Sequence, residues 1–196
     1  MCDVLRGGRI RRVEAFTEPE PFDAPGGLGT LTAFHTSGGA STGPRTFRGR
    51  LDTYEYKTLR YPGHYEKVRA MIELGLLDLD PVKVKGVPVV PRDLFHAVAG
   101  PRLEDPGVKD LALLRVDCTD RRGRGVRYQM LEYLDPRTGF TAMERTTGYP
   151  AAAIAADLAA ERLAPGARTP ERLGYGPGRV ADLRRRGLRI RRTRIA

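Results

Sequence analysis

The sequence is poor in cysteine and has no long apolar run. Only Cys2 and Cys118 are cysteines among its 196 residues, which excludes a disulfide framework and makes the cytoplasm the expected compartment. No stretch of about 18 apolar residues occurs, so we expect no membrane span. No apolar segment follows the basic N-terminus, so we expect no secretory signal. Apolar residues make up 40% and charged residues 30% of the chain, a balance typical of a globular protein.

Several motifs for common chemistries are also missing. Neither glycine-rich stretch, GGLGTL nor GYGPGR, fits the G-x-G-x-x-G dinucleotide fingerprint. The small polar loop at residues 35–43 is not followed by Gly-Lys-Ser/Thr, which excludes a P-loop. Ser37 or Ser41 beside His35 does not make a catalytic triad, because nothing places an orienting carboxylate. The histidines and cysteines are scattered without paired spacing, so we expect no metal site.

The net charge of +10 is concentrated at one end of the chain. Residues 162–196 hold eleven arginines, no lysine, and only Glu171 and Asp182 as acids, so this segment carries +9 and the first 161 residues carry +1. Single-strand binding by a basic segment uses interleaved aromatic side chains, and only Tyr175 lies nearby. Nucleic-acid binding is therefore the least favoured interpretation, beside a solvated or interface role for the segment.

Short strands and helices without strict alternation predict an α+β or mixed α/β fold. We expect one mixed, largely antiparallel sheet with helices packed on one of its faces. Gly and Pro favour a turn-rich break at residues 18–27. The expected strands lie at 9–16, 28–36, 51–57, 111–117, 126–134 and 188–195, and the expected helices at 64–77, 94–99, 150–163 and 180–186.

The densest cluster of reactive side chains is YKTLRYPGH, residues 56–64. It runs from a strand end through a Pro-Gly turn to a helix start, where backbone N–H groups and the helix dipole favour anions. Arg60 has a planar guanidinium that suits a carboxylate, and His64 can exchange a proton near neutral pH. The alternative is that Arg60 pairs with a surface acid and His64 merely begins a helix.

A second cluster is TAMERTTGYP, residues 141–150. Thr146 or Thr147 can cap a helix that begins at Pro150, and capping alone is the simpler interpretation. The functional interpretation is that the open helix end and the hydroxyl groups meet a charged group of a ligand.

These two clusters, together with GLGTLTAFHTSGGASTGPRTF and VPRDLFHAV, resemble the second half of the saccharopine dehydrogenase family, and most of all its lysine ε-dehydrogenase branch. The likeness runs in order from about Arg9 to about Leu188, and K-T-x-R-Y-P-G-H is its most specific string. The resemblance implies that residues 1–165 form a substrate and dimerisation domain of mixed α/β structure. Residues 166–196 would be its Arg-rich closing helix and strand, packed near a Rossmann half that this sequence lacks.

The resemblance also implies a function. The lysine branch oxidises the ε-amine of lysine to a semialdehyde with release of ammonia, and passes the hydride to NAD or NADP. We expect an amino-acid substrate such as lysine, a homodimer, a separate Rossmann-domain partner, and no activity of this chain alone. The alternative is a non-catalytic dimerisation or ligand-binding module. The resemblance assigns acid–base work to His64 and substrate binding to Lys57, Thr58, Arg60, Tyr61, Thr146, Thr147 and Gly148.

Overall fold

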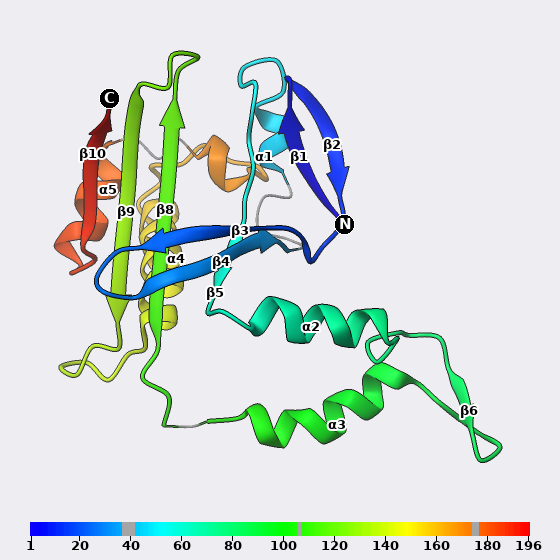
Figure 1. The fold of residues 1–196 in the computed structure, drawn as a ribbon. Helices are drawn as coiled ribbons and strands as arrows, with labels where there is room; N and C mark the ends of the chain where they lie inside the picture. The colour runs from blue at the N-terminus through cyan, green and yellow to red at the C-terminus, as the bar shows by residue number, and fades with distance from the viewer. Residues whose placement is uncertain (37–41, 106, 174–176) are drawn as a thin grey trace. The chain divides into compact units, whose positions relative to one another are not determined.

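The chain folds into two compact units, Met1–Val108 and Lys109–Ala196, in the computed structural model. Each unit has its own strands and helices (Figure 1), and the Arg-rich segment 166–196 belongs to the second. In the described part of the chain, no helix has both the length and the hydropathy to cross a membrane. The structure describes residues 1–36, 42–105, 107–173 and 177–196.

The α+β class is confirmed, but the strands are divided more finely than expected. Instead of one sheet, the described strands form four small sheets, in which all strand pairs are antiparallel. The many glycines and prolines keep the strands short, which favours several small sheets over one wide sheet.

The first unit contains three of these sheets and three helices. A three-stranded sheet with β4 in the middle lies between the β1–β2 and β6–β7 hairpins in chain order. The strands are β1 (Cys2–Arg6), β2 (Arg9–Val13), β3 (Thr17–Ala24), β4 (Gly29–His35), β5 (Thr58–Arg60), β6 (Val82–Val84) and β7 (Val87–Val89), and the helices are α1 (Gly43–Thr46), α2 (His64–Glu73) and α3 (Pro91–Leu103).

Strand β3 replaces the expected turn-rich break. Two prolines did not prevent the strand, because β3 lies at the edge of its sheet and pairs only with β4. An edge strand needs no backbone N–H on its outer side. The pairing shifts between Thr17 and Glu20, where two residues of β3 lie opposite one residue of β4. This β-bulge bends the strand next to the site described below.

Two other expected elements differ in extent. Residues 51–57 contribute one isolated bridge, Tyr54 to Leu5, rather than a strand. Helix α3 begins with Pro91, which needs no hydrogen bond at this position. The helix then continues past Ala99, the expected end, to Leu103.

The core of the first unit lies around Phe34 of β4, which is 1% exposed. The ring centroid of Phe34 is 5.2 Å from that of Phe16 and 5.0 Å from that of Tyr65 in α2. The Tyr65 hydroxyl donates to the Phe16 carbonyl at 3.1 Å. Burying a side chain of this size contributes about 1.5–3 kcal/mol, and the contacts place α2 on the Phe34 face of the sheet.

The second unit is built on a three-stranded antiparallel sheet in the order β10-β9-β8. The expected hairpin of residues 111–117 and 126–134 is confirmed, and the expected closing strand pairs with β9. Helix α4 contacts β8 and β9. The elements are β8 (Leu111–Thr119), β9 (Gly125–Tyr133), α4 (Ala142–Ala159), the 3₁₀ turn Pro170–Arg172, α5 (Pro177–Arg185) and β10 (Ile190–Ile195).

Helix α4 begins earlier than expected. Thr141 is its N-cap and forms a capping box with Glu144, so each residue bonds the backbone N–H of the other. Pro150, which we expected to start the helix, lies inside it. The prediction that Thr146 or Thr147 caps this helix is therefore wrong. The T-x-x-E start signal prevails over the proline because Pro150 loses only one backbone hydrogen bond within the helix.

Candidate functional site

The strand–turn–helix cluster places three predicted site residues on one face of a sheet. Thr58 of β5 pairs with Phe34 of β4, and Arg60 pairs with Thr32. Directly paired residues point to the same face of a sheet, so Thr58 and Arg60 share the Phe34 face. The ring of His64 stacks on Phe34 with a centroid distance of 6.4 Å and an interplanar angle of 23°. We call the surface formed by Thr58, Arg60 and His64 the α2 face.

The turn between β5 and α2 has the predicted form. Tyr61 follows the strand and is 56% exposed. Gly63 caps the helix with a φ of +84°, in the left-handed region where a residue with a Cβ would be strained. His64 is the first residue of α2. The alternative that His64 begins a helix is thus correct, and it does not conflict with a role in chemistry.

The polar groups of the α2 face are suited to different parts of a ligand. The hydroxyl oxygens of Thr36 and Thr58 lie 2.6 Å apart. Arg60 is exposed, and its guanidinium donates to the Leu59 carbonyl at 3.0 Å without an ion pair among the described residues. Partial burial lowers the pKa of His64 below its ordinary value, and the charge of Arg60 lowers it further. The imidazole is therefore neutral at neutral pH.

Lys57 lies on the opposite face of the same sheet. Its Nζ atom is 3.0 Å from a carboxylate oxygen of Glu20 and donates to the Glu18 carbonyl at 3.1 Å. Glu20 pairs with Ala33, whose side chain alternates in direction with that of Phe34. Lys57 is therefore tied to β3 and separated by the sheet from Arg60.

A second group of charged side chains, which the sequence did not reveal, lies on the Lys57 face. We call Arg6, Glu18, His35 and Glu55 the Arg6 cluster. Arg6 binds both carboxylates in a bidentate manner, at 3.0 and 2.5 Å to Glu18 and at 2.7 and 3.0 Å to Glu55. His35 is fully buried, and its Nε2 atom lies 3.3 Å from Glu18 and 3.4 Å from Glu55. Such charge-assisted pairs are the strongest hydrogen bonds in proteins.

Arg6 determines the ionisation of the cluster. Its hydrogen bonds lower the pKa of Glu18 from 4.5 to about 2 and also lower the pKa of Glu55, while the two carboxylates raise the pKa of Arg6. Glu18 has a φ of +54°, unusual for a residue with a Cβ. The β-bulge and this backbone conformation direct the Glu18 carboxylate toward Arg6. Both carboxylates are therefore anions over the physiological range.

The Arg6 cluster bears on two expectations from the sequence. Glu18, His35 and Glu55 bring three possible metal-donor atoms within 4.8 Å of one another. The NH2 atom of Arg6 lies within 3.3 Å of all three side chains, so a guanidinium supplies the positive charge there. The serines considered as nucleophiles beside His35, and Tyr175 in the basic segment, lie outside the described residues.

The second predicted cluster lies in the other unit and has a different form from that expected. Thr146 donates to the Ala142 carbonyl at 2.9 Å, and Thr147 contacts the sulfur of Met143 at 3.6 Å. Both hydroxyl groups are thus engaged within α4, and Gly148 is an exposed residue of the same helix. No open helix end lies at Thr146 or Thr147, so that part of the prediction is wrong.

The true start of α4 already holds an anion. The backbone N–H groups of Ala142 and Met143 donate to the carboxylate of Asp110 at 2.7 and 2.8 Å. A carboxylate at this position satisfies two unpaired donors and is stabilised by the helix dipole. The chain's own Asp110 therefore occupies the place that the sequence assigned to a ligand.

The described residues do not fit a dinucleotide. Such a site uses the helix N-terminus that follows the first strand of a parallel βαβ unit. Throughout the described ranges the paired strands are antiparallel, and the start of α4 binds Asp110. We therefore derive no chemical step through a nicotinamide from these residues.

One family model matches the chain over residues 2–187, and its description is saccharopine dehydrogenase C-terminal domain. The match includes the α2 face, the Arg6 cluster and helix α4. It thus extends through both units.

Proposed function

We propose, because the chain belongs to the saccharopine dehydrogenase C-terminal domain family, that it forms the substrate-binding side of an NAD(P)-dependent amino-acid oxidoreductase. Lysine is the proposed substrate, and its ε-amine is the group oxidised. The observation that carries this proposal is the α2 face, where a guanidinium without an ion pair lies on the same side of the sheet as a neutral imidazole and two hydroxyl groups. NAD or NADP would bind to a separate nucleotide-binding half in the cytoplasm, with segment 166–196 facing that half.

Each group of the α2 face has a role in this proposal. Arg60 binds the α-carboxylate of the substrate through its planar fork. The hydroxyl groups of Thr36 and Thr58 accept hydrogen bonds from the substrate ammonium group. His64 is neutral, so it can take a proton from that group before the carbon–nitrogen bond is oxidised. The Arg6 cluster and Lys57 position the sheet from its opposite face.

The role of Arg60 predicts how binding depends on the ligand. We expect the full chain to bind lysine, and the Arg60→Met variant to bind it at least tenfold more weakly, because the carboxylate loses a bidentate partner. Cadaverine, which has both amines but no carboxylate, should bind equally to both proteins. Calorimetric titration of lysine, norleucine and cadaverine measures these differences.

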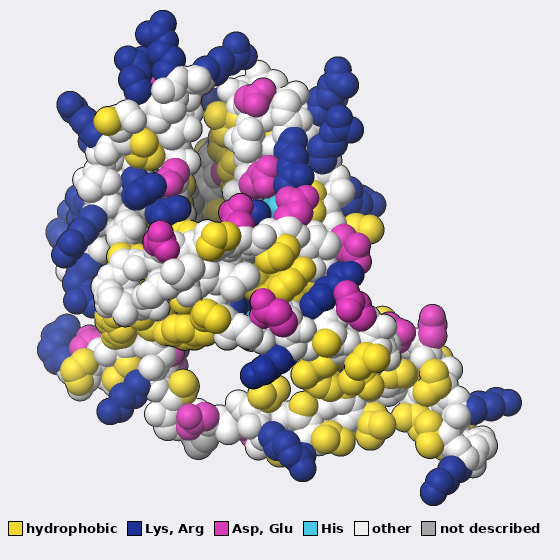
Figure 2. All heavy atoms as spheres, in the orientation of Figure 1, with side chains coloured by type: hydrophobic (Ala, Val, Ile, Leu, Met, Phe, Trp, Pro, Cys, Tyr) yellow, Lys and Arg dark blue, Asp and Glu magenta, His cyan; other side chains and the backbone are white. Residues whose placement is uncertain are grey.

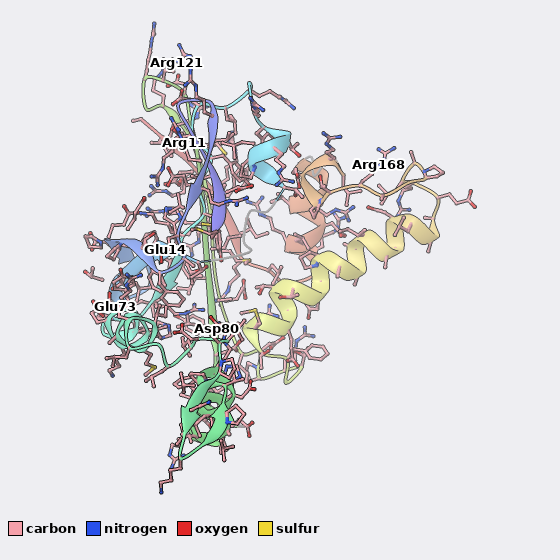
Figure 3. All side chains as sticks on the ribbon, turned by 90° about the vertical axis from the view of Figure 1, so that its right-hand side faces the viewer. Arg11, Glu14, Glu73, Asp80, Arg121 and Arg168 are labelled. Atoms are coloured by element: carbon pink, nitrogen blue, oxygen red, sulfur yellow. The ribbon has the colours of Figure 1, made fainter. Side chains whose placement is uncertain are left out.

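Arg11→Met is the matched control, because Arg11 is an exposed arginine of β2 (Figure 3) and is not part of the α2 face. Equal weakening of lysine binding in Arg11→Met and Arg60→Met would contradict the role of Arg60. Reduction of NAD⁺ or NADP⁺ with lysine, in the presence of the nucleotide-binding half, tests the oxidoreductase. Lysine binding without any reduction would favour the non-catalytic ligand-binding module instead.

The first unit also has an apolar surface that supports a homodimer. The end of α2, the β6–β7 hairpin and α3 enclose a groove of about 550 Å³, and Figure 2 shows apolar side chains gathered over these elements. Leu74 is 75% exposed and Val87 is 60% exposed. Contiguous apolar surface of this kind marks an interaction site, and a second copy offers the same surface to a two-fold interface. We propose that the second copy covers it.

The dimer proposal predicts that charges on this surface separate the copies. Leu94 and Val98 lie one helical turn apart on α3 and are both at least half exposed, so their replacement by lysine should leave the fold intact. We expect the wild type to sediment as a dimer and the Leu94→Lys/Val98→Lys variant as a monomer at the same concentration. Leu158→Lys, an exposed leucine of α4 in the second unit, is the control. A monomeric wild type, or equal dissociation of the control, would overturn the proposal.

A further inference from the structure

The second unit contains a polar cavity that the proposed function does not use. Its volume is about 290 Å³, and it lies among the end of β9, the turn that follows, the first turns of α4, and the link between α5 and β10. We call it the basic cavity. Its charged lining residues are Arg137, Arg145, Arg186 and Arg189, with Glu132 and Asp135 as the acids.

The two acids of the basic cavity already have partners within the unit. Glu132 is 1% exposed, lies 3.2 Å from Arg145, and accepts a hydrogen bond from the backbone N–H of Arg189 at 2.5 Å. Asp135 accepts hydrogen bonds from the backbone of Arg137 and from the hydroxyl of Thr138, both at 3.0 Å. These bonds lower the pKa of Asp135. Neither acid therefore needs a further cation from outside the protein.

The arginines of the cavity are less completely paired. Arg145 is buried, donates to two backbone carbonyls, and still has a buried Nε atom without a hydrogen-bond partner. Arg137 is exposed, and its guanidinium makes no ion pair in the described part of the chain. Arg189 reaches Glu132 only at 3.7 Å, and Arg186 shares Asp182 with two other arginines. The lining therefore carries an excess of positive charge.

We propose that the basic cavity binds a small oxyanion, either inorganic phosphate or the phosphoryl group of a small metabolite. Guanidinium groups bind tetrahedral oxyanions through paired N–H donors, and the cavity offers several from three different elements. Its volume is near the lower end of ligand pockets, which run from roughly 300 to 1,000 Å³. It therefore suits a single phosphoryl group better than a whole nucleotide. The proposal depends only on residues of the second unit and stands independently of lysine binding.

Calorimetric titration of the full chain with phosphate tests this proposal. We expect saturable binding of inorganic phosphate or of glycerol 3-phosphate at constant ionic strength, and at least tenfold weaker binding in the Arg137→Gln/Arg189→Gln variant. Both side chains are exposed, so the variant should fold, and Arg145 is left in place because it pairs with the buried Glu132. Binding of both phosphates identifies the free oxyanion as sufficient, whereas binding of the ester alone assigns the cavity to a phosphorylated metabolite.

Arg121→Gln is the matched control, since Arg121 lies in the turn between β8 and β9 (Figure 3) and does not line the cavity. It should bind phosphate as the wild type does. Absence of saturable binding for both probes would overturn the proposal. Equal weakening in the control and in the double variant would also overturn it, because the binding would then come from the general charge of the arginine-rich unit.

Discussion

Replacing Glu132 with leucine should lower the free energy of unfolding of the second unit by about 3–5 kcal/mol, because it leaves a buried charge without its partner. Glu132 is 1% exposed and the Arg145 side chain is 9% exposed, with 3.2 Å between them. Glu132 also bonds the backbone at Arg189, so the substitution removes the acceptor that holds the end of the α5–β10 link. Urea unfolding followed by circular dichroism measures the loss.

A second substitution separates the isolated charge from the lost contacts. Combining Glu132→Leu with Arg145→Met removes both charges, and the double variant should recover much of the stability, since apolar pairs of similar volume often replace a buried ion pair without loss. Asp117→Asn is the control, because Asp117 pairs with Arg127 at 2.7 Å on the exposed β8–β9 hairpin. An exposed pair contributes about 0–1 kcal/mol. If Glu132→Leu is no more harmful than this control, the ion pair does not hold the unit together.

The elements predicted correctly are those specified by neighbouring residues. The β8–β9 hairpin follows from alternating side chains around a polar turn, and the junction of β5 and α2 follows from a Pro-Gly break before a helical pattern. The start of α4 was also present in the sequence as Thr141 and Glu144, a capping box. Pro150 was given too much weight, because a proline inside a long helix removes one hydrogen bond without ending the helix.

The Arg6 cluster could not be predicted because its members meet only through distant pairings. Arg6 ends β1, and Glu55 follows the single bridge that joins Tyr54 to Leu5. The position of Glu18 depends on a β-bulge and a left-handed backbone, for which a glutamate gives no local signal. The one usable clue was that Glu55 lies two residues before Lys57, a spacing that places two strand residues on one face.

The same geometry explains why the candidate site is smaller than the motif that suggested it. Alternation along β5 sends Thr58 and Arg60 to the α2 face, while Lys57 contacts β3 on the other face. Adjacent residues of one conserved-looking string therefore serve two purposes, ligand contact on one face and support of the sheet on the other. A sequence motif shows the residues in order, but the period of the strand decides which of them can meet one ligand.

Replacing Arg6 with methionine should destabilise the first unit by about 2 kcal/mol at neutral pH, because two carboxylates lose their charged hydrogen-bond donor in a partly solvent-screened site. The variant should also invert the dependence on acid. In the wild type the pKa of Glu18 is about 2 instead of 4.5, so its contribution is complete above pH 4.5 and is lost as the pH falls toward 2. Without Arg6, the neighbouring carboxylates repel each other and their pKa values rise above the unfolded values. Protonation then stabilises the folded variant, and its stability should increase as the pH falls.

Urea unfolding of the two proteins between neutral pH and about pH 3 distinguishes these slopes. Arg11→Met is again the control, because Arg11 is an exposed arginine of the neighbouring strand β2 and its loss should leave the acid dependence of the wild type unchanged. His35 faces the same two carboxylates in all three proteins, so the difference between the slopes reports on Arg6. Parallel slopes for the wild type and Arg6→Met would show that Arg6 does not control the ionisation of Glu18 and Glu55. The cluster would then be a surface ion pair rather than the brace behind the proposed substrate-binding face.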